Sequence, residues 1–312
     1  MPILFTLILA LLFSASPLRA DSFPMQAKVV APGVYAIITP SRDLPNPQNK
    51  GWNSNSGFVI TNAGVLLFDS GSSAAIGSAI KSLIAKTTHQ PVRWIINSHA
   101  HGDHWLGNHA FKDTVQAIYS SDITAQRITN NAQSWVERFK KMTAGASGDS
   151  AILSPDRLIT KNTDLVFGST KVSLLLSANS HSPGDIFLWL ADRKVLIAGD
   201  VVYSDRMPST RDSELQHWIP LLDQLIAMQP DVVIPGHGAV TDVAGLKRLR
   251  DLLQAFWDAV QHAYQADKTA AEMTAEVIAA LAPFSQHYPG LAEKVRRDIS
   301  QVYLQVEAAS FR

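Results

Sequence analysis

Four potential metal ligands packed into six residues constrain this chain more than any other feature of its sequence. The segment Asn97–His104 reads Asn-Ser-His-Ala-His-Gly-Asp-His and directly follows the apolar, β-branched run Val92–Ile96. That run predicts a buried strand, so the four side chains follow its carboxyl end, where loops on a rigid sheet carry chemistry. Imidazoles and a carboxylate at this spacing predict a metal-binding loop.

The spacing within the loop predicts two ions. Side chains two residues apart in an extended segment point the same way, so His99 and His101 are expected to chelate one ion. Gly102 is expected to turn the chain, so that Asp103 and His104 face a second ion beside the first. A polar loop that is merely rich in histidine is the alternative, and average residue usage makes such a pattern rare by chance.

Composition narrows the partners and the metal. The 312 residues are 46% hydrophobic, and their 27 basic side chains balance 27 acidic ones without a long basic run. This describes a globular protein with a large core, and it argues against nucleic acid as a partner. We expect a small-molecule substrate instead. Because there are no cysteines, the metal must be held by histidine and carboxylate, which suits zinc and also iron or manganese.

The amino terminus resembles a secretory signal. Ile3–Phe13 is an apolar run followed by small residues up to Ala20, which predicts a signal peptide over residues 1–20 and a mature chain that starts at Asp21. The mature protein is then expected in the periplasm or secreted, with no membrane contact. A retained membrane anchor is the alternative, although the run is short for a bilayer span.

The rest of the chain repeats one pattern, in which an apolar strand leads to a ligand-type residue. The strand predicted at Val172–Leu176 precedes His181, and the strand pair over 186–190 and 194–197 ends at Asp200. Val232–Ile234 then precedes His237. Helices are predicted over 73–88, 121–141 and 213–228. We expect a metal-binding domain over 21–244 and a C-terminal helical extension over 245–312 packed on it, broken near Pro283 and Pro289.

The ligand motif carries a family resemblance. His99-Ala100-His101-Gly102-Asp103-His104, together with His181, Asp200 and His237, resembles the complete ligand set of the metallo-β-lactamase superfamily over roughly residues 28 to 240. The resemblance implies an α/β fold, a four-layer αβ/βα sandwich with the metals at one edge between two sheets. It assigns the first metal to His99, His101 and His181 and the second to Asp103, His104 and His237. Asp200 would bridge both ions.

The resemblance also implies an activity. We expect an exported hydrolase with two Zn²⁺ per chain that attacks a carbonyl ester-type bond (ester, lactone, thioester or β-lactam) with a metal-bound hydroxide. Asp103 and Tyr203 are the expected catalytic side chains. Tyr203 would donate to a developing oxyanion, as in lactone-cleaving members, and an ordinary structural tyrosine is the open alternative. Asp69 resembles the acid that orients the metal loop in this family.

Asp200 helps to distinguish between the enzyme classes of this superfamily. Zinc β-lactamases typically carry Cys or Ser at this position, so a carboxylate favours thioesterases, lactonases and dioxygenases. Residues 199–203, 206–209 and 302–307 are most similar to exported hydrolases grouped as quinoprotein relay system zinc metallohydrolases. The alternative is a periplasmic non-haem iron persulfide dioxygenase with the same ligands, since ligand type alone does not separate zinc from iron. Phosphodiester cleavage is the main rival reaction for a two-metal site.

Overall fold

The fold is built from two facing β-sheets, as seen in a computed structural model that describes residues 23–311. The predicted signal peptide lies outside the described residues. The first sheet has the strand order β1-β2-β3-β4-β5-β6-β7. Its strands are β1 (Ala27–Ala31), β2 (Val34–Ile37), β3 (Ser56–Thr61), β4 (Gly64–Phe68), β5 (Val92–Ile96), β6 (Ala117–Ser121) and β7 (Arg157–Ile159). Strands β1 to β4 pair antiparallel, whereas β4 to β7 pair parallel.

The second sheet has the order β12-β11-β10-β9-β8. Its strands are β8 (Thr163–Phe167), β9 (Thr170–Asn179), β10 (Pro183–Leu190), β11 (Val195–Tyr203) and β12 (Val232–His237). Only β11 and β12 are parallel in this sheet, because helix α4 (Leu215–Ala227) provides the crossover between them. Carboxyl ends of parallel strands from both sheets therefore meet at one edge, where the predicted ligands lie.

Apolar side chains fill the space between the sheets and beneath the helices. Val59 and Leu66 of the first sheet belong to the same buried cluster as Leu188 and Ile197 of the second. On the outside, α1 (Ala74–Thr87) buries Ile76, Ile80 and Ile84 against the first sheet, at the spacing of one helix face. Helix α3 (Asp122–Met142) contacts β6, β7 and β10. With α4 and α5 on the second sheet, this is the predicted four-layer αβ/βα sandwich, which is confirmed.

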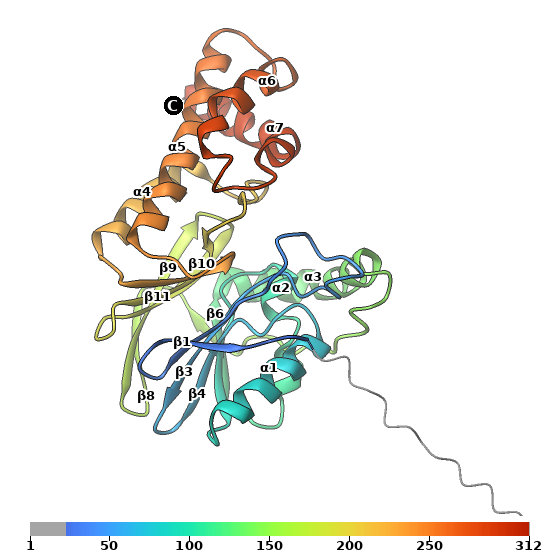
Figure 1. Cartoon of the computed structure of the whole chain (residues 1–312), viewed down its shortest axis with the longest axis vertical. Helices are drawn as coiled ribbons and strands as arrows, with labels where there is room; N and C mark the ends of the chain where they lie inside the picture. Colours follow the sequence, from blue (N-terminus) through green and yellow to red (C-terminus); the bar gives the residue numbers. More distant parts are fainter. Residues whose placement is uncertain (1–22, 312) are drawn as a thin grey trace, which may run out of the picture.

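The C-terminal helices continue the outer layer of the second sheet. They are α5 (Val243–Gln265), α6 (Ala270–Ala280) and α7 (Leu291–Ser310), in orange to red in Figure 1. Leu249, Leu253 and Phe256 of α5 are fully buried in one cluster with α4 and α7. The predicted breaks are present, since Pro283 lies in a 3-10 turn and Gly290 caps α7 in the left-handed region.

One local prediction was wrong. Strand β11 does not end at Asp200 but continues to Tyr203, so both residues lie on the strand. The turn expected at Gly102 is a change from extended backbone at His101 to the short helix α2 (Gly102–Trp105). Space is tight at Gly102, because a Cβ there would lie 3.1 Å from the Trp135 ring.

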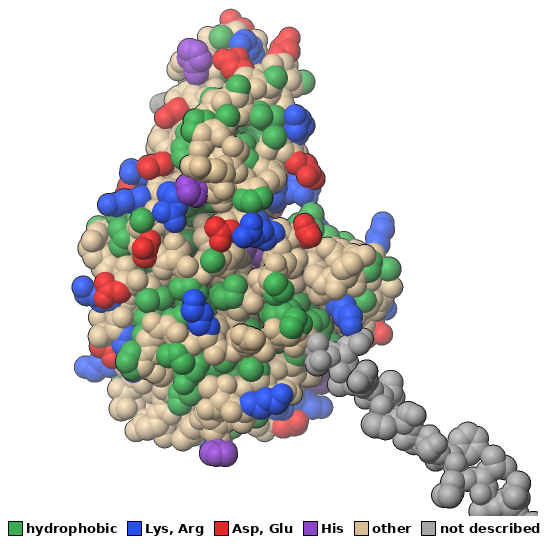
Figure 2. Space-filling view, in the orientation of Figure 1, with side chains coloured by type: hydrophobic (Ala, Val, Ile, Leu, Met, Phe, Trp, Pro, Cys, Tyr) green, Lys and Arg blue, Asp and Glu red, His purple; other side chains and the backbone are tan. Residues whose placement is uncertain are grey.

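The surface carries charges of both signs. Basic and acidic side chains are mixed over the face shown in Figure 2. Within residues 23–311, no helix combines the length and the apolar character needed to span a bilayer.

Candidate metal centre

All seven predicted ligands lie together at the edge between the two sheets. They are delivered by the segment after β5 (His99 and His101), by α2 (Asp103 and His104), by the β9–β10 turn (His181), and by β11 and β12 (Asp200 and His237). His101 is the N-cap of α2, so Asp103 and His104 occupy the first helical turn. The strand ends and this turn place donors from both sheets around one point.

The first group of donors matches the requirements of a single ion. His101 Nδ1 lies 2.9 Å from His99 Nε2 and 3.2 Å from His181 Nε2. Asp200 Oδ2 lies 3.4 Å from His181 Nε2 and 3.7 Å from His99 Nε2. Ligands of a tetrahedral zinc ion, each roughly 2.0–2.1 Å from the metal, lie about 3.3 Å apart. These four side chains are therefore spaced to hold one ion.

A second group lies beside the first. Asp103 Oδ2 is 3.7 Å from His104 Nε2 and 3.6 Å from His237 Nε2. Asp200 contacts this group as well, because its Oδ1 lies 3.2 Å from His104 Nε2 and its Oδ2 3.2 Å from His237 Nε2. His104 Nε2 and Asp200 Oδ1 are buried without a hydrogen-bond partner in the described chain. A cation would satisfy both atoms, so the residues fit a pair of divalent ions with Asp200 between them.

Asp69 sets the orientation of the metal loop. Its carboxylate accepts hydrogen bonds from His104 Nδ1 at 2.7 Å, from the Ser98 amide at 2.8 Å and from the Ser98 hydroxyl at 2.7 Å. Burial raises the pKa of Asp69, and His104 opposes this effect. Since His104 donates from Nδ1, its Nε2 presents a lone pair to the second group. Asp69 therefore lies where a residue that orients the metal loop must lie.

The segment before β3 supports the second group from the other side. The backbone oxygen of Asn53 accepts from His237 Nδ1 at 2.7 Å, which directs Nε2 toward the ligand cluster. The Asn53 side chain donates to Asp103 Oδ2 at 2.9 Å. The Asn55 side chain donates a hydrogen bond to the Pro235 oxygen at 2.9 Å, which joins this segment to β12. No motif in the sequence predicts these contacts.

Tyr203 points at the shared carboxylate. Its hydroxyl donates to Asp200 Oδ2 at 2.5 Å, and its ring stacks on the His237 ring. Burial and the charge of Asp200 raise the pKa of Tyr203 well above its ordinary value, so it remains a hydrogen-bond donor. Burial alone would raise the pKa of Asp200, but His237 and His104 hold it well below the usual range. Asp200 is therefore ionised and able to bind cations.

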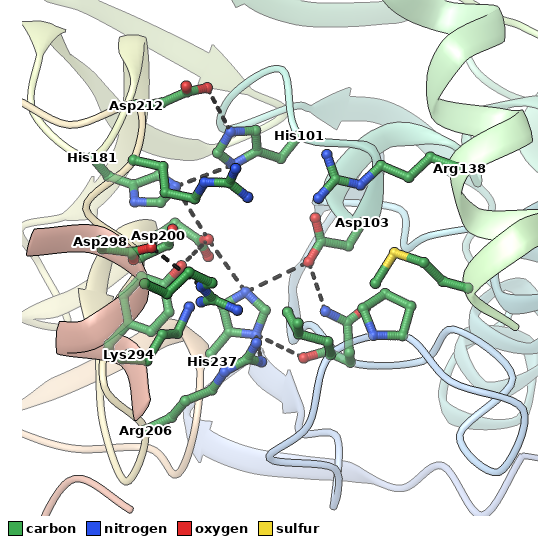
Figure 3. A pocket seen from close by; sticks show the side chains of 18 of the residues that line it. His101, Asp103, Arg138, His181, Asp200, Arg206, Asp212, His237, Lys294 and Asp298 are labelled. Atoms are coloured by element: carbon green, nitrogen blue, oxygen red, sulfur yellow. Dashed lines mark hydrogen bonds and ion pairs between the residues drawn. The ribbon is translucent and has the colours of Figure 1, made fainter. Parts of the chain in front are cut away.

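The cluster forms the floor of an open cavity of about 590 Å³. Figure 3 shows Asp103 and Arg138 on one side of this cavity and Lys294, Asp298 and Arg206 on the other. Five cationic side chains line it, namely Arg138, Arg206, Arg211, Lys294 and Arg297, and apolar side chains including Leu44, Trp135 and Met142 border it. The residues from α7 were not predicted, because no motif links them to the metal loop.

A sequence profile of the metallo-beta-lactamase superfamily matches residues 49–237. The chain belongs to this superfamily, as its ligand motif predicted.

Curated relatives match different shares of the chain. A linear primary-alkylsulfatase of Pseudomonas sp. (strain ATCC 19151) is 25% identical over 290 residues, which cover 77% of this chain and 54% of the alkylsulfatase. The chain thus spans about half the length of that relative. A metallo-beta-lactamase type 2 of Bacillus sp. (strain 170) is 25% identical over 206 residues, 64% of this chain and 73% of the enzyme.

Solved structures show the same fold. A metallo-beta-lactamase from Pontibacter korlensis superposes with a TM-score of 0.61 at 20% identity, over 74% of this chain and 99% of that one. A double mutant of a sec-alkyl sulfatase superposes with a TM-score of 0.67 at 17% identity, over 92% of this chain and 52% of that one. The match to the sec-alkyl sulfatase covers the larger share of this chain.

Proposed function

We propose that this protein is a hydrolase with two zinc ions that cleaves a carbonyl ester-type bond in an ester, lactone, thioester or β-lactam. One observation carries the proposal: seven histidine and aspartate side chains converge in two groups around Asp200, at the floor of a cavity large enough for a small molecule. Zinc held there would lower the pKa of bound water to about 7 and polarise the bond under attack.

We assign Asp103 and Tyr203 to the reaction. Burial opposes ionisation of Asp103, yet His104 and His237 lower its pKa, so its carboxylate stays charged. Asn53 holds this carboxylate in place through the 2.9 Å bond to Oδ2. Tyr203 lines the cavity as a protonated phenol whose proton bonds to Asp200, and in our assignment it redirects this hydrogen bond to negative charge that develops on a substrate oxygen.

Hydrolysis of a sulfate ester is a second candidate. Two observations favour it: the similarity to an alkylsulfatase extends over 77% of this chain, and five cationic side chains line the cavity. A sulfate ester carries a negative charge that such side chains attract. The same ligand set would serve both reactions.

Zinc, rather than iron, and a location outside the cytoplasm complete the proposal. Ligands consisting only of histidine and aspartate support zinc and do not exclude iron, so an iron persulfide dioxygenase is the competing assignment. The apolar run Ile3–Phe13 and the small residues up to Ala20 support export to the periplasm or beyond. Mass analysis of the exported protein should find a chain that begins at Asp21.

A substrate panel tests the reaction. Purified protein should be assayed on a chromogenic β-lactam, an aryl ester, a lactone, a thioester, an aryl sulfate and a phosphodiester. We expect turnover of carbonyl compounds, lost with a chelator and restored by zinc, and absent from Asp200→Ala. Preference for the aryl sulfate would select the second candidate. Preference for the phosphodiester, or activity that requires iron and consumes oxygen, would contradict the proposal.

A further inference from the structure

Helix α7 forms a wall of the cavity that lies outside the stretch matched by the superfamily. Lys294, Arg297, Asp298 and Gln301 line the same cavity as the metal ligands, although the superfamily match covers residues 49–237. In Figure 3, Lys294 and Asp298 lie on the same side of the cavity as Asp200. This wall is therefore placed to act on whatever binds at the metal centre.

Buried hydrogen bonds fix α7 at this position. Asp298 Oδ2 accepts from the Thr210 amide at 3.2 Å, and Gln305 Oε1 accepts from the Leu215 amide at 2.9 Å. The first bond joins α7 to the segment that follows β11, and the second joins it to the first residue of α4. Lys294 precedes Asp298 by four residues, which places both on one face of the helix. The position of Lys294 at the cavity is thus set by the fold.

Two cations that line the cavity, Lys294 of α7 and Arg206 of the segment after β11, form no ion pair in the described chain. Lys294 is partly buried, and within residues 23–311 its ammonium group forms no ion pair or hydrogen bond. Burial and the charge of Arg297 lower the pKa of Lys294 to about 8, so it is still mostly cationic at neutral pH. Arg206 is only 8% exposed and also forms no ion pair in this part of the chain. A buried charge is costly unless it is paired.

The contact between Arg206 and His237 does not give the Arg206 guanidinium a hydrogen-bond acceptor. Arg206 lies 3.0 Å from His237 Nδ1. However, Nδ1 donates its proton to the Asn53 oxygen at 2.7 Å when Nε2 serves as a ligand. Nδ1 then has no lone pair to accept from Arg206. The guanidinium is left with free donors at the edge of the cavity.

The two acids of the cavity outside the ligand cluster already have partners. Asp298 pairs with Arg297 at 3.2 Å, in addition to its bond from the Thr210 amide. Asp212 pairs with Arg127 at 2.9 Å and contacts His101 at 3.1 Å. Divalent ions in the cluster would bring more positive charge than Asp103 and Asp200 remove. The charges of Arg206 and Lys294 are therefore available to an anion from outside the chain.

We propose that Arg206 and Lys294 bind an anionic group of the substrate beside the metal centre. The proposal rests on the hydrolase function proposed above and narrows the substrate to a small molecule that carries a compact oxyanion. A guanidinium and an ammonium give such a group several charge-assisted hydrogen bonds. A carboxylate next to the scissile bond and a sulfate ester are the two sources of this oxyanion that the experiment separates.

Titration calorimetry on the zinc-loaded full chain tests the site without turnover. The probes are inorganic sulfate and glutarate, and the proteins are the parent, Arg206→Gln, Lys294→Met and the control Arg296→Gln. Arg296 is an exposed cation on α7 that does not line the cavity. We expect the Kd of the bound anion to rise about tenfold in the first two variants and to stay unchanged in the control.

Two results of the titration would overturn the proposed anion site. Anions held by the metals alone would bind equally to parent and variants, and a parent that binds neither probe has no anion site. The zinc content of each variant is measured in parallel, because Arg206 contacts a ligand. Lys294 contacts none, so Lys294→Met keeps the test valid if Arg206→Gln loses metal.

Kinetics separate the two sources of the anion. Three substrates with the same nitrophenol leaving group are compared: a neutral ester, an ester that carries a carboxylate, and an aryl sulfate. Lys294→Met should raise KM about tenfold for the anionic substrate that is hydrolysed, and leave the neutral ester unchanged. Equal losses on neutral and anionic substrates would overturn the anion site and leave the hydrolase function standing. If none of the three is hydrolysed, the wider substrate panel described above decides the proposed function, and the calorimetry decides the anion site independently.

Discussion

At the base of the metal loop, the Asp69 carboxylate accepts from His104 Nδ1 at 2.7 Å and twice from Ser98. Asp69 has a φ of 60°, in the left-handed region that few residues other than Gly, Asn and Asp adopt. The backbone is therefore shaped to bring this carboxylate under the loop. Because it holds the proton on Nδ1, Asp69 controls which nitrogen of His104 is available to a metal.

Asp69→Asn tests this control with little change of shape, since Asn also tolerates the left-handed region. An amide in place of the carboxylate loses the charge that holds the proton on His104 Nδ1. We expect the affinity for the second ion to fall about 10–100-fold. Stepwise metal release to a chelator measures this. The control is Asp192→Asn, whose carboxylate is 63% exposed. Equal release from parent and Asp69→Asn would rule out the orienting role.

Lys294 offers a prediction for stability. Its pKa of about 8 in the folded chain lies below the ordinary value of 10.5. Between these values the unfolded chain binds more protons, so the stability of the parent rises with pH in this window. Lys294→Met cannot titrate. At pH 7 it should be more stable than the parent by about 1–2 kcal/mol, and the difference should shrink toward pH 10.

Denaturant unfolding of both proteins at pH 7 and pH 10 measures this difference. Arg296→Gln serves as the control, with no difference from the parent expected at either pH. A gain in Lys294→Met that is the same at both pH values would show that the stabilisation comes from packing and not from the buried charge.

At the scale of single elements, an irregularity in β11 explains how two of the site residues meet. Residues three apart on a regular strand point to opposite faces. The pairing of β11 with β12 shifts register on either side of Gly199, which has a φ of 53°. A Cβ at Gly199 would lie 2.6 Å from the Ser98 Cβ. The irregularity lets Asp200 and Tyr203 face the same site, and it permits the metal loop to approach closely.

Helix α7 depends on a similarly specific contact. Gln305 accepts from the Leu215 amide at 2.9 Å and donates to the Ser213 oxygen at 2.7 Å, and it is buried. Gln305→Ala would leave both backbone groups unsatisfied. We expect a loss of about 1–3 kcal/mol in the free energy of unfolding, measured by denaturant titration. Gln133→Ala, which removes only an exposed contact with Glu137, should change it by less than about 0.5 kcal/mol. A loss no larger than this control would contradict the anchoring role.

Across the whole molecule, the sequence predicted what depends on local pattern. Strands such as Val92–Ile96 are recognisable because both faces are buried, and the ligands follow such strands at short, fixed distances. The metal loop also carries a specific motif, so its family and fold followed. The strand β11 extended further than predicted because an irregular strand has no simple alternation in its sequence.

The contribution of α7 to the cavity was out of reach for the same reason. Lys294 lies 94 positions after Asp200 in the chain. Its approach to the metal centre depends on the packing of α5 and α7 and on bonds such as that between Asp298 and the Thr210 amide. No pattern among neighbouring residues predicts a contact between positions so far apart in the chain. Asn53 was missed because its contacts with Asp103 and His237 join residues 50 and 184 positions apart in the chain.

We infer that the chain holds two zinc ions that share Asp200, and elemental analysis measures this. The mature protein, Asp200→Ala and His181→Ala are measured for zinc and iron per chain. The parent should contain two zinc ions, Asp200→Ala should lose the second ion more than the first, and His181→Ala should weaken the first. One iron per chain with negligible zinc, or equal occupancy in the parent and Asp200→Ala, would contradict the claim.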